Sequence, residues 1–251
     1  MTESTPRSFD VLILGGGSGG YAAALRASQL GLTVGLVEES KVGGTCLHNG
    51  CIPTKALLHA AELADNAREG EKYGVNSTLQ GIDMLKVNSY KQGVIDRLYR
   101  GLQGLVKSRK VTVIEGRGRL VGQDAIEVNG ERYTGTNIVL ATGSYARSLP
   151  GLEIGGRVIT SDQALQMEWV PQSAIVLGGG VIGVEFASVW KSFGSDVTVV
   201  EALPHLAPNE DEALSKGLER AFRKRGINFK VGVKFQGVEQ SDQGVKVTLE
   251  D

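Results

Sequence analysis

The chain has 251 residues, a formal net charge of −1 and 41% hydrophobic residues. This length allows one large domain or two modest ones with a substantial core, and the balanced charge excludes a global field that favours nucleic acid or an anionic membrane. No apolar run reaches transmembrane length. Residues 1–8 carry no signal-peptide or transit-peptide pattern, so we expect a cytoplasmic protein with neither nucleic acid nor a membrane as partner.

The first pattern in chain order is a strand, a glycine-rich turn, a helix and a second strand. Residues 10–14 form a short apolar run that predicts a buried parallel strand. Residues 15–20 fit G-x-G-x-x-G, and a helix is predicted over 21–30. A second strand over 33–37 leads into Glu38, which lies 23 residues after the first glycine of the motif. This order and spacing predict a dinucleotide-binding unit.

Each glycine of this motif has its own physical task. Gly15 allows a tight turn, Gly17 lets a pyrophosphate approach the backbone, and Gly20 permits the helix to pack closely on the strand. The start of the helix offers free N–H groups to the phosphates, and Glu38 can accept hydrogen bonds from an adenosine ribose.

The same pattern returns in the second half of the chain. A strand over 173–177 precedes the glycine motif 178–183, a helix is predicted over 184–193, and a strand over 196–200 leads into Glu201. Glu201 again lies 23 residues after the first glycine of its motif. One such motif is weak evidence in a glycine-rich chain, whereas two complete units with identical spacing are strong evidence. The alternative, two glycine-lined turns that bind nothing, stays open.

The second acid also predicts which cofactor its unit selects. Gly178, Gly180 and Gly183 repeat the roles of the first motif, and the carboxylate of Glu201 favours the 2′-hydroxyl of NAD over the 2′-phosphate of NADP. A protonated His205 could soften that repulsion, but we expect it to be a surface loop residue.

The remaining segments complete an α/β pattern. Helices are predicted over 51–66, 82–108 and 210–225, strands over 111–115 and 137–140, and hairpins over 125–134 and 234–249. Gly93, Gly101 and Gly104 weaken the expected continuity of the second helix. A Leu-Pro-Gly turn near residue 150 predicts a boundary between domains 1–150 and 151–251. We therefore expect two Rossmann-like, three-layer domains, the second of which looks truncated.

Both cysteines of the chain lie shortly after the first nucleotide motif. Cys46 and Cys51 are five positions apart, so a disulfide between them needs a distorted turn, which Gly50 could provide. The Gly43-Gly44-Thr45 run before them could let the chain pass close to a flat ring, and a helix N-terminus here would lower the pKa of nearby thiols. Lys55 adds positive charge one turn beyond Cys51.

The two cysteines have two alternative interpretations. A zinc site could draw on Cys46, His48, Cys51 and His59, but their spacing is not a common structural zinc pattern, so we expect no metal. The cysteines could also be two reduced, buried thiols without a redox role.

These motifs together resemble the pyridine nucleotide–disulfide oxidoreductases, and most closely the dihydrolipoamide dehydrogenases among them. The matching stretches are GGGSGG, GGTCLHNGCIPTK, VLATGS, LPG, GGGVIGVE and VVE, and they occur in order along the chain. The resemblance implies that the first unit binds FAD and the second binds NAD. It assigns to the cofactors Gly15, Gly17, Gly20, Glu38, Gly44, Thr45, Lys55, Thr142, Gly143, Gly178, Gly180, Gly183 and Glu201.

The resemblance also implies the roles of four catalytic residues. Cys46 would exchange with a dithiol substrate, Cys51 would contact the flavin as a thiolate, and Lys55 would lie near the flavin with Glu185 as its ion-pair partner. For Glu185 the alternative is a helix N-terminal acid that only interacts with the helix dipole.

By the same resemblance, electrons would pass from dihydrolipoamide through a Cys46–Cys51 disulfide and FAD to NAD⁺. The implied partner is a lipoyl-bearing protein of a 2-oxoacid dehydrogenase-type complex, and the full-length family is expected to be homodimeric. Family members are longer, and the second flavin-contacting motif and the domain with the catalytic His–Glu pair are not found in this sequence. Two alternatives stay open: a catalytically silent nucleotide-binding fragment, and a glutathione-type or mercuric reductase, against which Glu201 argues.

Overall fold

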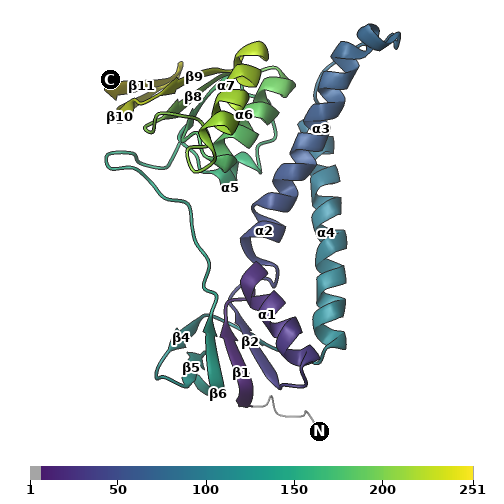
Figure 1. The fold of residues 1–251 in the computed structure, drawn as a ribbon, viewed down its shortest axis with the longest axis vertical. Helices are drawn as coiled ribbons and strands as arrows, with labels where there is room; N and C mark the ends of the chain where they lie inside the picture. The colour runs from purple at the N-terminus through teal and green to yellow at the C-terminus, as the bar shows by residue number, and fades with distance from the viewer. Residues whose placement is uncertain (1–6, 251) are drawn as a thin grey trace. The chain divides into compact units, whose positions relative to one another are not determined.

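The computed structural model describes residues 7–250. Most of the stretch on which we predicted no targeting peptide therefore lies outside the described residues. The chain divides into two compact units, the first built from the residues up to Pro53 and Gln92–Tyr145, the second from Thr54–Lys91 and the residues from Ala146 onward (Figure 1). The domain ranges 1–150 and 151–251 stay a prediction.

The first unit is built on a six-stranded sheet. Its strands are β1 (Ser8–Leu14), β2 (Val34–Glu38), β3 (Thr112–Glu115), β4 (Gly118–Leu120), β5 (Ala125–Val128) and β6 (Glu131–Leu140). Their order is β3-β2-β1-β6-β5-β4, with β3, β2, β1 and β6 parallel and β6, β5 and β4 antiparallel. The parallel part forms the Rossmann-type core that the sequence predicts.

Alternating side chains of the parallel strands point to opposite faces of this sheet. Ile13 and Leu36 pack on the face shared with α1 (Ser18–Gln29), whereas Leu12 and Val37 pack with side chains of the β5–β6 hairpin. All four are almost completely buried. The apolar runs therefore fill both faces, as expected for a parallel sheet covered on both sides.

Two details of the first unit differ from the sequence prediction. The predicted hairpin strand and the predicted strand 137–140 are one continuous strand, β6, which passes through Gly135. A Cβ at Gly135 would lie 2.7 Å from Cβ of Leu12, so glycine here permits close approach rather than a break. Strand β4 was not predicted. The type I′ turn is confirmed, because Asn129 and Gly130 both have positive φ, 53° and 80°.

The predicted long helix is continuous. Helix α4 (Met84–Ser108) runs through Gly93, Gly101 and Gly104, and a Cβ at any of these glycines would meet open space. Its buried residues include Met84, Ile95 and Val106, so packing along one face outweighs the low helix propensity of glycine.

The second unit is also an α/β fold, with a smaller parallel sheet than the first. Its elements are α3 (Cys51–Glu69, from Thr54 onward), η1 (Gly70–Tyr73), the part of α4 up to Lys91, α5 (Ser161–Ala164), β7 (Ser173–Leu177), α6 (Val181–Phe193), β8 (Asp196–Glu201), α7 (Glu212–Lys224), β9 (Asn228–Val231), β10 (Lys234–Ser241) and β11 (Gly244–Glu250). The parallel sheet has the order β7-β8-β9, and β10 and β11 form the predicted antiparallel hairpin. Strand β9 and helix α5 were not predicted. The α/β class with two Rossmann-like units is confirmed.

The core of the second unit joins helices to this sheet. Leu57 on α3 belongs to the same buried cluster as Val189 and Trp190 on α6 and Val199 on β8. Across residues 7–250, the structure contains no helix with the length and apolar character needed to span a membrane.

Candidate functional site

The two glycine motifs fold into turns of nearly identical geometry. Gly15 has φ of 104° and Gly178 has φ of 103°, values that L-residues with a side chain rarely adopt. Gly17 and Gly180 are the N-caps of α1 and α6, with ψ of −171° and −179°. The sequence repeat is therefore also a repeat of backbone conformation.

The third glycine of each motif is required by close helix–strand packing. A Cβ on Gly20 would lie 1.7 Å from the carbonyl oxygen of Gly15, and a Cβ on Gly183 would lie 1.9 Å from that of Gly178. Any side chain at either position would push the helix away from its strand. This is the packing role that the motif predicts for its third glycine.

The acid after each second strand is held in the same way. Glu38 accepts hydrogen bonds from the backbone N–H of Gly16 (2.7 Å) and of Ser40 (2.9 Å). Glu201 accepts from the N–H of Gly179 (2.7 Å) and of Leu203 (2.8 Å). Each carboxylate oxygen has about two lone-pair sites, so each glutamate keeps acceptor capacity for a ribose hydroxyl.

The chain also returns to each glycine turn after the acid. The N–H of Gly43 donates to the carbonyl of Gly16 (2.8 Å), and the N–H of Ala207 donates to the carbonyl of Gly179 (2.7 Å). The structural repeat thus extends beyond the sequence motif, to a loop that folds back over the turn.

Both turns fit a dinucleotide. Among the described residues, neither Gly17 nor Gly180 provides a side-chain cap for the helix that follows it. The first backbone N–H groups of α1 and α6 are therefore placed to bind phosphate oxygens, helped by the positive end of the helix dipole. Together with the acids, this arrangement supplies the donors and acceptors that a pyrophosphate and a ribose require.

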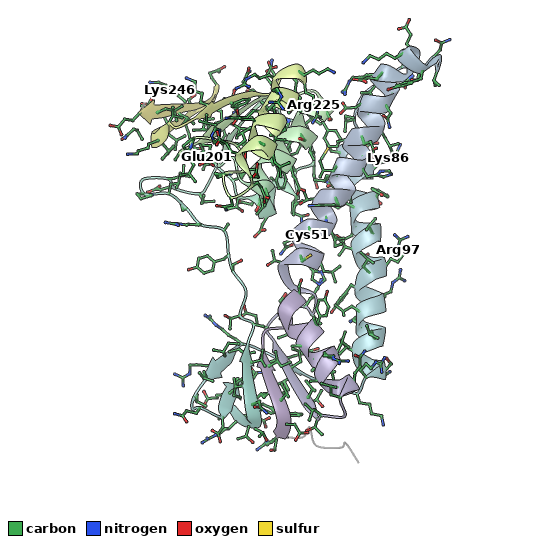
Figure 2. All side chains as sticks on the ribbon, in the orientation of Figure 1. Cys51, Lys86, Arg97, Glu201, Arg225 and Lys246 are labelled. Atoms are coloured by element: carbon green, nitrogen blue, oxygen red, sulfur yellow. The ribbon has the colours of Figure 1, made fainter. Side chains whose placement is uncertain are left out.

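The cysteine segment folds as two helices with a break between them. Cys46 lies on the short helix α2 (Gly44–His48), and Cys51 is the first residue of α3 (Figure 2). The break falls at Asn49 and Gly50, and a Cβ on Gly50 would lie 2.9 Å from the carbonyl oxygen of Thr45. Both cysteines are free thiols in this structure, Cys46 half-buried and Cys51 exposed.

This segment lies against the first glycine turn. A Cβ on Gly44 would come within 2.6 Å of Cα of Gly17, so the two backbones are nearly in contact. The side chain of Cys46 interacts with the hydroxyl of Ser18, the first residue of α1. The structure thus places a thiol beside the turn where the sequence predicts the first cofactor.

The expectation that a helix N-terminus lowers the thiol pKa is wrong for Cys46. Its pKa is raised, first because its side chain hydrogen-bonds to that of Cys51 and then because burial disfavours the charged thiolate. The interaction with Ser18 acts in the opposite direction but is smaller. The neighbouring Cys51 side chain is therefore the largest influence on this pKa.

The other residues predicted for the first cofactor surround the same turn. Thr142 and Gly143 follow β6 after Ala141, and a Cβ on Gly15 would lie 2.1 Å from the carbonyl oxygen of Ala141 and 3.3 Å from Cα of Thr142. Thr45 is exposed on α2 next to the half-buried Gly44. The structure therefore brings Thr142, Gly143, Gly44 and Thr45 to the loops around the first glycine turn.

Lys55 and Glu185 form an ion pair within the second unit. The ammonium Nζ of Lys55 lies 2.6 and 2.8 Å from the two carboxylate oxygens of Glu185. Glu185 is not in the first turn of α6, which begins at Val181, so the alternative of a helix N-terminal acid does not describe it. The side chain of Lys55 remains 58% exposed and that of Glu185 29% exposed, which leaves the pair accessible to a ligand.

The histidines have partners of their own. His48 contacts the carbonyl oxygen of Val42 (3.0 Å) and packs edge-on against Tyr99, while His59 pairs with Glu62 (3.4 Å). Within residues 7–250, no group of three or more His, Cys, Asp or Glu side chains is arranged to hold a metal ion.

His205 differs from the surface loop residue that we expected. Its side chain is only 31% exposed and lies between two carboxylates, Glu212 (3.6 Å) and Glu219 (3.5 Å). Glu219 is itself buried, and sequence reasoning missed it because α7 is rich in charge. The burial of Glu219 could have been recognised from its spacing, because Ser215, Glu219 and Phe222 fall on one face of the helix.

The chain is similar to known proteins over almost its whole length. The sequence model described as "Pyridine nucleotide-disulphide oxidoreductase" matches residues 9–251. The dihydrolipoyl dehydrogenase of Bacillus subtilis is 47% identical over 240 residues, covering 90% of this chain and 51% of that protein. The mitochondrial dihydrolipoyl dehydrogenase of Pisum sativum is 40% identical, covering 96% of this chain and 50% of that protein. The chain thus spans about half the length of these curated relatives.

Solved structures show the same fold. LpdA from Mycobacterium tuberculosis matches with a TM-score of 0.85 at 27% identity, over 95% of this chain and 55% of that chain. The HOCl-induced flavoprotein disulfide reductase RclA from Escherichia coli matches with a TM-score of 0.77 at 28% identity, over 96% of this chain and 53% of that chain. With two Rossmann-type turns, a cysteine pair beside the first of them and a family match over almost its whole length, the chain belongs to the pyridine nucleotide-disulphide oxidoreductases.

Proposed function

We propose that this chain is the nucleotide-binding half of a flavin-dependent disulfide oxidoreductase of the dihydrolipoyl dehydrogenase type. The observation that carries the proposal is the position of the thiols. Cys46 interacts with both Cys51 and Ser18, and Gly44 nearly touches Gly17, so a dithiol lies at the first nucleotide turn. A dithiol in that place is suited to exchange electrons with a cofactor ring and a disulfide substrate.

In the oxidised protein the two cysteines would form a disulfide. A thiolate of dihydrolipoamide attacks Sγ of Cys46, and Cys51 leaves as a thiolate. The second thiolate of the substrate then displaces Cys46 and closes the cyclic disulfide of lipoamide. The substrate loses two electrons and two protons, and the cysteine pair gains the two electrons. Because only thiolates attack, a base has to accept the substrate proton.

The first unit would hold FAD. Gly15, Gly17 and Gly20 shape the turn for its pyrophosphate, and Glu38 accepts hydrogen bonds from its ribose. Gly44, Thr45, Thr142 and Gly143 would line the ring and its chain, as the resemblance implies. Bound FAD would supply the two-electron step between the cysteine pair and a nicotinamide. The Lys55–Glu185 ion pair would set the local charge that tunes the flavin.

The second unit would hold NAD. Gly178, Gly180 and Gly183 shape its turn, and Glu201 would accept a hydrogen bond from the 2′-hydroxyl of the adenosine ribose. The same carboxylate repels a 2′-phosphate, which supports NAD over NADP. This preference also separates the proposal from a glutathione-type or mercuric reductase.

For the whole protein we propose a homodimer in the cytoplasm that acts on a lipoyl-bearing protein of a 2-oxoacid dehydrogenase-type complex. The dihydrolipoyl dehydrogenase relatives support the proposed substrate class.

A spectroscopic experiment tests the proposal. The purified chain is loaded with FAD, its visible spectrum is recorded, and dihydrolipoamide is added without oxygen. We expect flavin absorption and then a long-wavelength band from the contact of a thiolate with the flavin. Cys51→Ser should abolish that band, whereas Cys46→Ser, which leaves the flavin-facing thiol in place, should retain it.

Two outcomes would overturn parts of the proposal. A chain that retains no FAD at any concentration contradicts the first cofactor site. A band that disappears in Cys46→Ser but persists in Cys51→Ser contradicts the assigned roles of the two thiols. If the chain binds both FAD and NAD⁺ but forms no NADH when dihydrolipoamide is added, it is a nucleotide-binding fragment without turnover.

A further inference from the structure

Helix α7 holds the loop that follows Glu201 by two buried side chains. The hydroxyl of Ser215 donates to the carbonyl oxygen of Ala207 (3.2 Å), and the carboxylate of Glu219 accepts from the N–H of Leu206 (3.2 Å). Ser215 is 1% exposed and Glu219 is 7% exposed. Because the two residues are four positions apart, they lie on the same face of α7 and bind adjacent backbone groups of one turn.

The turn that they hold is strained. Ala207 has φ of 49°, a left-handed conformation that is uncommon for a residue other than glycine. Such a conformation persists only where surrounding contacts enforce it. The bonds from Ser215 and Glu219 flank this residue and are therefore suited to enforce it.

The same turn packs directly on the second glycine motif. The N–H of Ala207 donates to the carbonyl of Gly179 (2.7 Å), and a Cβ on Gly179 would lie 2.7 Å from Cδ2 of Leu206. Leu206 is completely buried. The position of the loop is thus coupled to the position of the motif by a hydrogen bond and by close packing.

The glycine motif and the loop each donate one hydrogen bond to the carboxylate of Glu201. Its Oε2 accepts from the N–H of Gly179 and its Oε1 accepts from the N–H of Leu203, the second residue of the loop. A shift of the loop would therefore move both donors that orient the carboxylate.

The buried charge of Glu219 has partners on two sides. Its carboxylate lies 3.5 Å from Nδ1 of His205 and 3.6 Å from the guanidinium of Arg223. Arg223 in turn lies over the ring of Phe229, 4.6 Å from its centroid. These contacts keep a carboxylate inside the fold, where an unpartnered charge would be costly.

We propose that Ser215 and Glu219 are positioning residues that fix Glu201 for a ribose with a free 2′-hydroxyl, and so set the nucleotide preference of the second unit. The inference rests on the proposed NAD site. The ligand class is an adenosine nucleotide without a 2′-phosphate, and neither residue has to touch it.

The test measures binding by titration calorimetry, with ADP-ribose and 2′-phospho-ADP-ribose as probes. The quantity compared is the ratio of the two dissociation constants. We expect the unmodified chain to prefer ADP-ribose, and Glu219→Ala to reduce that preference by about fivefold, the lower end of coupling between two sites. Glu219→Gln retains an oxygen acceptor for Leu206 and should preserve most of the preference. Glu212→Gln is the matched control, because Glu212 contacts His205 without holding the loop backbone.

A Glu201→Gln background shows whether Glu219 changes the nucleotide preference by positioning Glu201. In a Glu201→Gln chain, adding Glu219→Ala should leave the ratio unchanged. Should Glu219→Ala fail to fold, Ser215→Ala removes a single hydroxyl and carries the same test. A preference that Glu219→Ala and Ser215→Ala both leave intact overturns the inference alone. Absence of ADP-ribose binding by the unmodified chain overturns the proposed NAD site and the inference with it.

Discussion

The two glycine-turn units are alike in their turns and different in what surrounds them. Strand β1 lies between β2 and β6, and its residues Leu12 and Ile13 are fully buried. Strand β7, among the residues that the structure describes, pairs with β8 alone, and its Ile175 is 40% exposed. The same local motif therefore folds correctly both in the interior and at the edge of a sheet. Its geometry is a local property of the glycines and the acid.

The segments after the two acids differ more. Both loops return to the glycine turn through one amide–carbonyl hydrogen bond, made by Gly43 in the first unit and by Ala207 in the second. The first then enters α2, which carries Cys46, and the second leads to α7, which carries Glu219. The shared part of the repeat fits a nucleotide in both units. The part that is not shared brings a thiol to one turn and a buried carboxylate beside the other.

The largest effect that would test this comparison is at the third glycine of each turn. Gly20→Ala and Gly183→Ala should each destabilise their own unit by about 3 kcal/mol, because the new Cβ would overlap a backbone carbonyl. Urea unfolding, followed by hydrogen exchange of the β1 and β7 amides, would measure the stability of each unit on its own.

The matched controls are Gly19→Ala and Gly217→Ala. Both are helical glycines, and a Cβ would meet open space at Gly19 and only the end of the Arg220 side chain at Gly217. They should be neutral or stabilising by up to about 1 kcal/mol. If Gly20→Ala and Gly19→Ala unfold at the same urea concentration, the third glycine is not needed for close packing.

Substitution of the first glycine of each motif should destabilise the two units by different amounts. Gly15 and Gly178 share the same positive φ, so alanine at either position introduces similar backbone strain of about 1 kcal/mol. At Gly15 a Cβ would also lie 2.1 Å from the carbonyl oxygen of Ala141, whereas at Gly178 it would meet nothing within 4 Å. We expect Gly15→Ala to cost an additional ~1 kcal/mol, measured by the same exchange experiment. Equal losses would mean that the strand beside Gly15 does not constrain it.

The thiol beside the first turn provides a pH-dependent test. Because the pKa of Cys46 is raised, its thiolate should form at higher pH than that of an unstructured cysteine. Alkylation of Cys46 by iodoacetamide, followed by peptide mass spectrometry, should therefore be slow at neutral pH and accelerate in more alkaline solution.

Two variants should shift this profile in opposite directions. Cys51→Ala removes the largest cause of the raised pKa and should move the alkylation profile to lower pH. Ser18→Ala removes a contact that lowers the pKa and should move the profile to higher pH. A profile that neither variant moves would show that the two side chains do not control this thiol.

The smallest expected effect concerns the Lys55–Glu185 ion pair, whose carboxylate has no counterpart in the first glycine motif. Ala22 occupies in the first motif the position that Glu185 occupies in the second, seven residues after the first glycine. Since Lys55 is largely exposed, its pairing with Glu185 should contribute only about 0.2–1 kcal/mol to stability. A double-mutant cycle of Lys55→Met and Glu185→Gln in urea unfolding measures this coupling. A coupling well above that range would make the pair structural rather than a means of placing charge.

The glycine turns could be predicted from sequence because their determinants are local. The positions of Gly15, Gly20 and Glu38 follow from spacing alone, and the structure reproduces them in both units. The raised pKa of Cys46 could not be predicted, since it depends on the distance between two side chains across a break in the helix.

The role of α7 was missed for a similar reason. A run such as Glu-Arg-Ala-Phe-Arg-Lys indicates a charged surface helix, and propensity does not reveal that Glu219 is buried against the backbone N–H of Leu206, with His205 and Arg223 as further partners. The continuity of β6 through Gly135 was also missed, because the close approach of Leu12 that makes glycine necessary there comes from another strand.

Helix α4 has one further consequence. It carries Gly93, Gly101 and Gly104 on its exposed side, which lower its intrinsic helix propensity, so its stability depends in part on the burial of residues such as Met84 and Val106. If either of those anchoring contacts loosened, the neighbouring turns would unwind readily. The circular dichroism of the chain at helical wavelengths is therefore a sensitive gauge of whether both ends of this helix are still packed.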